Sequence, residues 1–429
     1  MMRLRLHGGR VIDPANQLDS PLDLWIADGC IAAVGRAPDG FQTDREIDVS
    51  GRIVCPGLVD LRAHLREPGE EHKATIASET AAAASGGITT LCCPPDTAPV
   101  IDTPAVATLI QQRARAAGLV RVLPIGALTQ SLQGERISEM GALKAAGCVG
   151  VSNARHPIGN TLVMRRAMEY AATHDLTVFL HAEDPWLRNN GCVHEGQVST
   201  RLGLPGIPEA AETVAVARDL ALIRQTGVRA HFSQLSTAEA VRMVARAQFD
   251  GLPVSADVSA HHLHLTEIDL GYFDSQCHVH PPLRTERDRD ALRTGLAKGT
   301  LLAVCSDHQP HDSDAKCGPF AETAPGISGL ETLLPLSLRL VQDGILPLSE
   351  LIARLSLQPA RLLGVDAGTL SVGSPADVCV FDPEEYWDVN PAKMVSRGRN
   401  TPFTGWQLQG RVDWTLYKGK ITFERTAAR

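Results

Sequence analysis

The middle of the chain alternates short apolar runs with longer segments of helical period. Segments rich in Ala, Arg and Leu, such as 161–174 and 210–227, have the pattern of amphipathic helices. The apolar runs between such segments have the pattern of buried strands bounded by turn residues. These runs are 57–65, 87–95, 120–128, 147–154, 176–184, 228–236, 252–263 and 301–311.

Eight buried strands separated by helices, over roughly 250 residues, predict a (β/α)8 TIM-like barrel of the α/β class. A doubly wound open sheet is the alternative. The glycine fingerprint that often accompanies such a sheet is missing, and so is a Walker sequence.

Both ends of the chain have a different pattern from the middle. Residues 3–57 and 368–424 contain short strands broken by Asp-Gly, Gly-Gly and Ser-Gly turns. Because chain termini often lie close together, we expect the two ends to form one small β-sandwich domain. The predicted division is 1–54 with 366–429 for the sandwich and 55–365 for the barrel.

Composition and charge narrow the class of protein. The 429 residues are 44% hydrophobic and 21% charged, as in an ordinary globular protein with a large core. The net charge of -8 argues against nucleic acid or an acidic membrane surface as the main partner. The ten cysteines include no Cys-x-x-Cys pair, so we expect buried free thiols. The sequence has neither a signal peptide nor an apolar stretch that spans a bilayer, which predicts a cytoplasmic protein.

Polar side chains follow most of the eight predicted strands, where a barrel of this kind builds its site. We therefore expect a working or vestigial site on this rim. Histidines with a closing aspartate suggest hydrolysis assisted by a divalent metal that activates water. His64, His181 and Asp307 end the first, fifth and eighth strands and can converge across the barrel mouth. Alternatively, His64 is a hydrogen-bonded core residue and Asp307 caps a helix.

Several longer segments resemble those of the dihydroorotases, a family of the amidohydrolase superfamily, and the resemblance extends over nearly the whole chain. It implies a metal-dependent barrel beside a sheet domain, and a reaction that opens or closes a cyclic amide. The segments are "GLVDLRAHLREPG", "SGGITTLCCPPDTAPV", "HAEDPWL", "HEGQVSTRLGLPGIPEAAET", "HPPLRTERDR", "SDHQPHDSDAK", "PGISGLETLLPL" and "NTPFTGWQLQGRV".

The resemblance implies metal ligands that this chain has partly lost. Active members supply two histidines from the first strand, a carboxylate after the fourth, histidines from the fifth and sixth, and an acid from the eighth that is also the general base. Three of these positions are occupied by His64, His181 and Asp307. At the others the chain has Arg62, Ala154 and Gln234. We therefore expect the binuclear zinc site to be lost, which leaves no zinc or one.

Of the positions that the resemblance implies to bind the substrate, some keep the residue of the family and others do not. Arg66, which pairs with the substrate carboxylate in the family, and His311 are retained. Asp96 replaces the asparagine of Pro-Asn-Thr, and His280 replaces the asparagine before Pro-Pro-Leu-Arg. An acid at position 96 would repel anionic dihydroorotate or carbamoyl aspartate by ~1–4 kcal/mol at a few Å.

Arg62 places a permanent cation beside His64, where a metal would bring its own positive charge. The guanidinium can instead pair with Asp307 and neutralise an acid that would otherwise be buried alone. We hypothesise that Arg62 is a metal surrogate that keeps the old site folded.

Two functions from different classes follow. In the first, the chain is a non-catalytic dihydroorotase-like protein of pyrimidine biosynthesis. The resemblance then implies association with the catalytic chain of aspartate carbamoyltransferase, whose assembly it supports, and hence an oligomer. In the second, the chain is an active cyclic amidohydrolase with a mononuclear site of His64, His181 and Asp307. Asp307 would then move the proton, and the substrate would be dihydroorotate or another cyclic imide.

Overall fold

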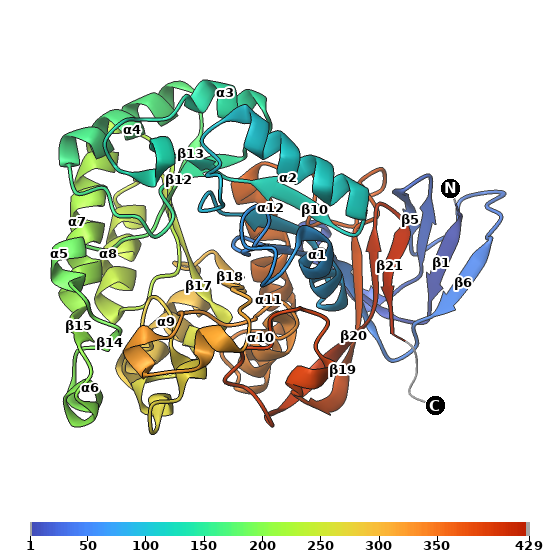
Figure 1. The fold of residues 1–429 in the computed structure, drawn as a ribbon. Helices are drawn as coiled ribbons and strands as arrows, with labels where there is room; N and C mark the ends of the chain where they lie inside the picture. The colour runs from blue at the N-terminus through green and yellow to red at the C-terminus, as the bar shows by residue number, and fades with distance from the viewer. Residues whose placement is uncertain (1, 426–429) are drawn as a thin grey trace.

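A computed structural model describes residues 2–425 (Figure 1). Eight parallel strands form the barrel. They pair in two arcs, β10–β9–β8 and β11–β12–β13–β16–β17–β18. One junction is the short break between β10 and β11, and at the other Ala63 bridges to His308. The strands are β8 (Leu58–Asp60), β9 (Ile88–Cys93), β10 (Arg121–Pro124) continued as β11 (Gly126–Ala127), β12 (Gly150–Ser152), β13 (Thr177–Leu180), β16 (Ala230–Phe232), β17 (Val254–Ser259) and β18 (Ala303–Cys305).

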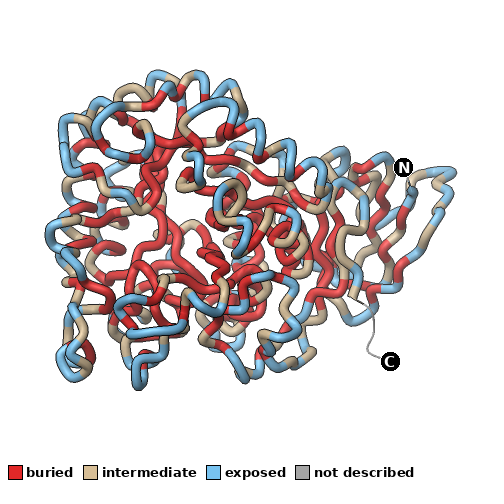
Figure 2. The backbone as a smooth tube through the Cα atoms, viewed as in Figure 1, coloured by how far each residue is buried: buried red, intermediate tan, exposed pale blue. Residues whose placement is uncertain are grey.

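Helices cover the outside of the barrel, and Figure 2 shows buried backbone inside this exposed layer. In α4 (Thr161–Thr173), Met164, Ala167, Met168 and Ala171 are buried, three and four positions apart, which is the expected amphipathic spacing. The others are α1 (Ile76–Ser85), α2 (Pro104–Ala117), α3 (Met140–Ala145), α5 (Pro185–Arg188), α6 (Gln197–Leu202), α7 (Glu209–Thr226), α8 (Ala238–Phe249), α9 (Glu286–Ala297), α10 (Leu333–Gln342), α11 (Leu348–Leu355) and α12 (Leu357–Leu363).

Strands from both ends of the chain form two further sheets beside the barrel (Figure 1). The first has the order β5–β4–β1–β6, and the second β21–β20–β19–β7–β2–β3. Both contribute to one apolar core, in which Leu6 and Ile26 of the first sheet pack with Val378 and Leu416 of the second. The strands are β1 (Leu4–His7), β2 (Arg10–Asp13), β3 (Leu18–Pro21), β4 (Leu24–Ala27), β5 (Cys30–Val34), β6 (Arg45–Asp48), β7 (Ile53–Pro56), β19 (Val378–Asp388), β20 (Gln407–Tyr417) and β21 (Lys420–Glu424).

The predicted fold, a (β/α)8 barrel with a small sheet domain from both chain ends, is confirmed. The boundaries placed at 54/55 and 365/366 stay predictions. A small pair of parallel strands, β14 (Val193–His194) and β15 (Gly206–Ile207), was not predicted and lies in the segment after β13. All ten cysteines are free and eight are buried. None of the helices described within residues 2–425 is long and apolar enough to cross a membrane.

Candidate functional site at the barrel mouth

The segments that follow the barrel strands hold several residues in left-handed backbone. Four of them are Arg66 (φ 62°), Ala154 (φ 48°), Gln234 (φ 57°) and Asp307 (φ 45°). Residues other than glycine rarely adopt this conformation, and it persists where the surrounding structure enforces it, often at functional sites. The last three are positions at which the family resemblance implied metal ligands.

Asp307 is buried in the mouth and is contacted by two arginines and two glutamines, of which Gln309 donates to Oδ1 at 3.4 Å. Arg155 Nη2 donates to both carboxylate oxygens, at 3.0 and 2.9 Å. Gln234 Nε2 donates to Oδ1 at 2.8 Å, and Arg62 Nε lies 3.3 Å from the same oxygen. Burial raises the pKa of Asp307, but the charges of Arg155 and Arg62 outweigh it and hold this pKa below its usual value. The carboxylate is therefore ionised, and its oxygens are engaged by the protein itself.

Arg155 contacts both oxygens of Asp307, and sequence reasoning did not single it out. It directly follows Ala154, where the family resemblance implied a carboxylate ligand. An arginine beside a position where the resemblance implied an acid was the available signal. Because that arginine approaches an acid on the opposite part of the barrel, 152 residues away in sequence, only the fold reveals the pairing.

His64 and Asp96 form a second pair. His64 Nε2 lies 3.0 Å from Asp96 Oδ2. Burial raises the pKa of Asp96, but the neighbouring His64 and Arg62 lower it by more. The pKa of Asp96 therefore lies below its usual value. One ring nitrogen of His64 is therefore paired with a carboxylate, whereas Nδ1 is buried without a hydrogen-bond partner among residues 2–425.

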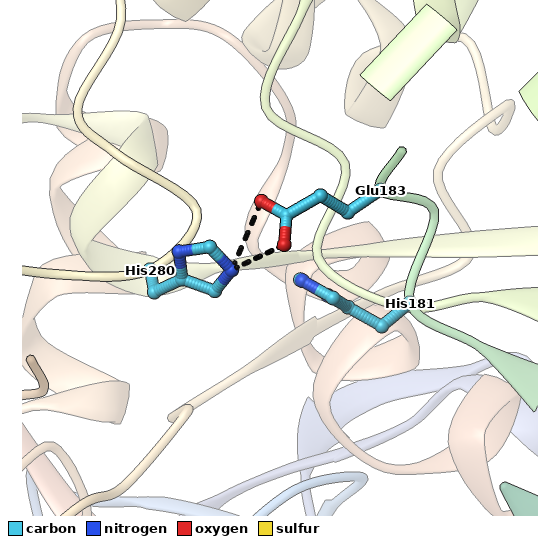
Figure 3. Close-up of side chains that lie close together, drawn as sticks. All are labelled: His181, Glu183 and His280. Atoms are coloured by element: carbon cyan, nitrogen blue, oxygen red, sulfur yellow. Dashed lines mark hydrogen bonds and ion pairs between the residues drawn. The ribbon is translucent and has the colours of Figure 1, made fainter. Parts of the chain in front are cut away.

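His181, Glu183 and His280 form a third group, shown in Figure 3. His280 Nε2 lies 3.1 and 3.2 Å from the two carboxylate oxygens of Glu183. The rings of His181 and His280 are tilted against each other, with centroids 5.1 Å apart. Both ring nitrogens of His181 are buried and have no hydrogen-bond partner among residues 2–425. Sequence reasoning placed His181 and His280 in different roles and did not predict this group.

The predicted ligand set of His64, His181 and Asp307 is not assembled. Within residues 2–425, the one group of three or more His, Cys, Asp or Glu residues whose ligand atoms lie within 4.8 Å of one another is His181, Glu183 and His280. Convergence of the three predicted ligands therefore requires rearrangement. The physical reason is competition: nearby charged side chains of the protein already bind His64 and Asp307.

The four predicted substrate-binding residues have protein partners as well. Arg66 Nε donates to the carbonyl of Pro310 at 2.9 Å, and its two terminal nitrogens contact Glu70 at 2.8 Å and His311 at 3.1 Å. Arg66 and Asp96 line one cavity of about 260 Å³ beside His64, whereas His280 lies against Glu183. A substrate role for these residues stays a prediction.

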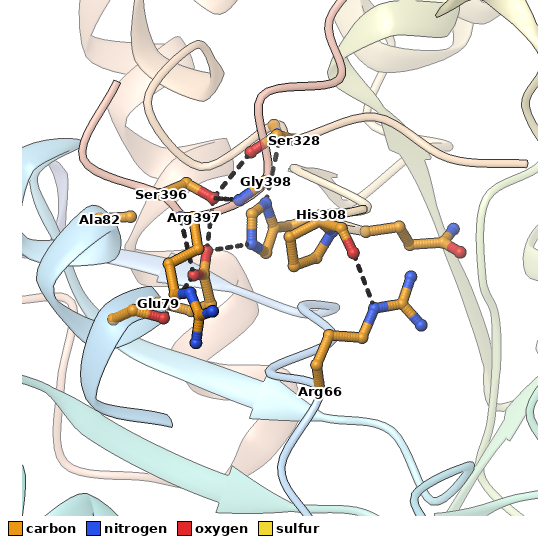
Figure 4. Close-up of polar contacts among 12 residues, drawn as sticks. Arg66, Glu79, Ala82, His308, Ser328, Ser396, Arg397 and Gly398 are labelled. Carbon is orange, nitrogen blue, oxygen red and sulfur yellow. Dashed lines mark hydrogen bonds and ion pairs between the residues drawn. The ribbon is translucent and has the colours of Figure 1, made fainter. Parts of the chain in front are cut away.

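A buried polar network holds the segment that carries Asp307 (Figure 4). Glu79 Oε2 accepts from His308 Nε2 at 2.8 Å and from Ser396 Oγ at 2.6 Å, and Glu79 Oε1 accepts from the Arg397 amide at 3.2 Å. The Gly329 amide donates to the other ring nitrogen of His308. The network connects α1, the segment after β18 and residues 396–397.

Buried histidines predict that the folded state is sensitive to acid. Burial lowers the pKa of His262 to about 4, and burial with the charge of Arg66 lowers that of His311 to about 2, whereas a histidine in the unfolded chain titrates near ~6.5. As the pH falls below ~6.5, the unfolded chain binds protons that the folded chain cannot. Each such histidine then lowers the free energy of unfolding by up to about 1.4 kcal/mol per pH unit, until its folded pKa is reached.

We expect the urea midpoint to fall between about pH 7.5 and about pH 5.5, and a His262→Asn variant to show a smaller fall. A midpoint that stays constant over this range would contradict the assignment of buried, neutral histidines.

The sequence matches two family descriptions: Dihydro-orotase-like over residues 51–240, and Amidohydrolase family over residues 201–423. A "Dihydroorotase-like protein" of Pseudomonas aeruginosa is 52% identical and covers 99% of this chain and 100% of its own length. A protein of the same name from Pseudomonas putida is 51% identical over 98% of this chain and 99% of its own. A "Dihydroorotase" of Geobacter sp. (strain M21) is 45% identical over 99% and 100%.

Solved structures agree on the fold. An L-hydantoinase (dihydropyrimidinase) from Arthrobacter aurescens superposes with a TM-score of 0.88 over 100% of this chain and 98% of its own, at 23% identity. At that identity the likeness concerns the fold alone. The close relatives and the matching families together establish that this chain belongs to the dihydroorotase family of the amidohydrolase superfamily.

Proposed function

We propose that this chain is a non-catalytic member of the dihydroorotase family that supports the assembly of aspartate carbamoyltransferase in pyrimidine biosynthesis. The non-catalytic assignment rests on the contacts that the Asp307 carboxylate makes. Its carboxylate, which would be metal ligand and general base in an active member, accepts from Arg155 and Gln234 and lies against Arg62.

The side chains at the old ligand positions do not fit a pair of zinc ions. A catalytic zinc needs three protein ligands and an open position. Positions 62, 154 and 234 offer a guanidinium, a methyl group and an amide, and none of these is a customary zinc ligand. The guanidinium groups of Arg62 and Arg155 beside Asp307 would also repel a cation placed there. Arg62 and Arg155 together supply positive charge that balances the buried acid, which extends the surrogate hypothesis from one arginine to two.

The role in assembly rests on the family resemblance and on the retained fold. The chain covers essentially the full length of relatives whose printed name is dihydroorotase-like protein. A barrel that keeps its architecture without a catalytic metal pair is suited to a structural role. The partner we propose is the catalytic chain of aspartate carbamoyltransferase, in a hetero-oligomer.

Two measurements test the two parts separately. The isolated chain, with and without added zinc, is assayed for cyclisation of carbamoyl aspartate; we expect no rate above background, and turnover at an enzyme-like rate would reject the non-catalytic assignment. The chain is also co-expressed with the carbamoyltransferase catalytic chain of the same organism. We expect the two to co-elute as one complex, and separate elution would reject the assembly role.

An active cyclic amidohydrolase with one metal ion remains the second candidate. It is favoured by the group of His181, Glu183 and His280 and by the cavity beside Arg66. Zinc-dependent turnover that is lost on substitution of Arg66 would support this candidate.

A further inference from the structure

We propose that His181, Glu183 and His280 form a binding site for a single divalent cation of the zinc class, displaced from the positions where the family resemblance implied metal. Each of these residues offers one ligand atom within 4.8 Å of the others. Figure 3 shows the three side chains pointing toward one another. Only His181 belongs to the ligand set implied by the resemblance, so the site is a new combination of residues.

The unpartnered ring of His181 is an independent indication of a ligand. Both of its nitrogens are buried and lack a hydrogen-bond partner among the described residues. Buried polar atoms are nearly always satisfied, because an unmade hydrogen bond leaves the cost of desolvation uncompensated. A cation bound by one of these nitrogens would remove that cost.

The donor set selects the class of cation. Two imidazoles and one carboxylate are the ligands of many zinc sites with an open fourth position, whereas magnesium and calcium prefer oxygen ligands. His280 supplies the second imidazole where the family resemblance implied an asparagine. The histidine therefore adds a metal ligand at a position that an amide would not provide.

The backbone brings the ligands in from segments far apart in the chain. His181 directly follows β13, Glu183 lies two residues further, and His280 lies 97 residues beyond Glu183. His280 Nε2 already lies 3.1 Å from Glu183 Oε1, so a small separation of these two groups admits an ion. Arg188 Nε lies 3.6 Å from Glu183 Oε2, and its side chain is 40% exposed, so it can turn toward solvent when a cation binds.

The local charge permits a cation here more readily than at Asp307. Glu183 brings one negative charge. Arg155 and Arg62 are paired with Asp307, which offsets part of their repulsion. At Asp307 itself a cation would have to displace those arginines. A cation at the proposed site would leave the ion pairs of Asp307 in place. The proposal can thus hold whether or not the chain catalyses a reaction.

The test is metal binding by the full-length chain after treatment with a chelator. We expect titration calorimetry to give one equivalent of zinc and no binding of magnesium at the same concentration. Cobalt(II) should produce visible absorption bands of a low-coordinate site. His280→Asn, Glu183→Gln and His181→Asn should each weaken zinc binding at least ~10-fold.

His64→Asn is the matched control, because it removes a buried histidine of the same mouth that is outside the proposed ligand set. Circular dichroism verifies that each variant is folded. Zinc affinity should be unchanged in this control. Absence of stoichiometric zinc binding would overturn the proposal, as would binding that survives in His280→Asn but disappears in His64→Asn. Neither outcome depends on the turnover assay of the proposed function.

Discussion

Replacing Asp307 with asparagine is expected to lower the free energy of unfolding by about 3–5 kcal/mol, because it leaves the buried guanidinium of Arg62 and the partly buried one of Arg155 without their counter-ion. Asparagine keeps the volume of the side chain, so lost packing contributes little. Arg155 and Arg62 would then face an amide instead of a carboxylate. Urea denaturation near neutral pH measures the change. If Asp307 were only a metal ligand, the same substitution would remove activity and leave the metal-free fold nearly as stable as before.

A double-mutant cycle separates the ion pair from other effects of the substitution. Arg155→Met removes one of the two cations, and we expect the Asp307→Asn/Arg155→Met double variant to be more stable than the sum of the two single changes predicts. A coupling energy of about 1–3 kcal/mol would fit two residues in one network. Additive effects would contradict the proposal that ion pairs between Asp307 and the two arginines hold the site together. A decrease in the free energy of unfolding below about 1 kcal/mol in Asp307→Asn alone would contradict it as well.

Replacing Glu79 with glutamine is expected to destabilise the protein by about 3 kcal/mol, since the new amide cannot accept from every donor that the carboxylate satisfies. Glu79 is fully buried and accepts from His308, Ser396 and the Arg397 amide. The Gly329 amide donates to Nδ1 of His308, so Nε2 carries the proton and cannot accept a hydrogen bond from the new amide NH2. Urea denaturation gives the size of the effect.

The matched control for this variant is Glu169→Gln. Glu169 forms ion pairs with Arg165 and Arg166 along the surface of α4. Surface pairs of this kind stabilise proteins by less than about 1 kcal/mol. Equal losses in the two variants would mean that the buried network contributes no more than a surface pair. This result would contradict the conclusion that the buried Glu79 network fixes the segment that carries Asp307.

The hydrophobic pattern was sufficient to predict the architecture. Each of the eight apolar runs contains one barrel strand, and α4 was expected within one residue of its observed end. The two β-rich chain ends do share one core. These features depend on local periodicity and on the burial of apolar faces, both of which are visible in sequence.

The contacts within the mouth were harder to predict. The family resemblance implied that Arg62 stands at a ligand position, and its approach to Asp307 follows from neighbouring strands. Arg155 contacts the same acid, and His280 contacts Glu183. In both pairs the side chains come from distant segments and have several charged groups nearby with which they could pair. One sequence cannot decide such a competition, because distance and burial set its outcome.

Diffraction from crystals soaked in zinc, recorded at the zinc absorption edge, tests the central claim most directly. We predict that Arg155 still contacts both oxygens of Asp307 and that no anomalous peak lies within ligand distance of that carboxylate. An anomalous peak bound to Asp307, with Arg155 turned away, would contradict the claim that guanidinium groups have taken the place of the metal.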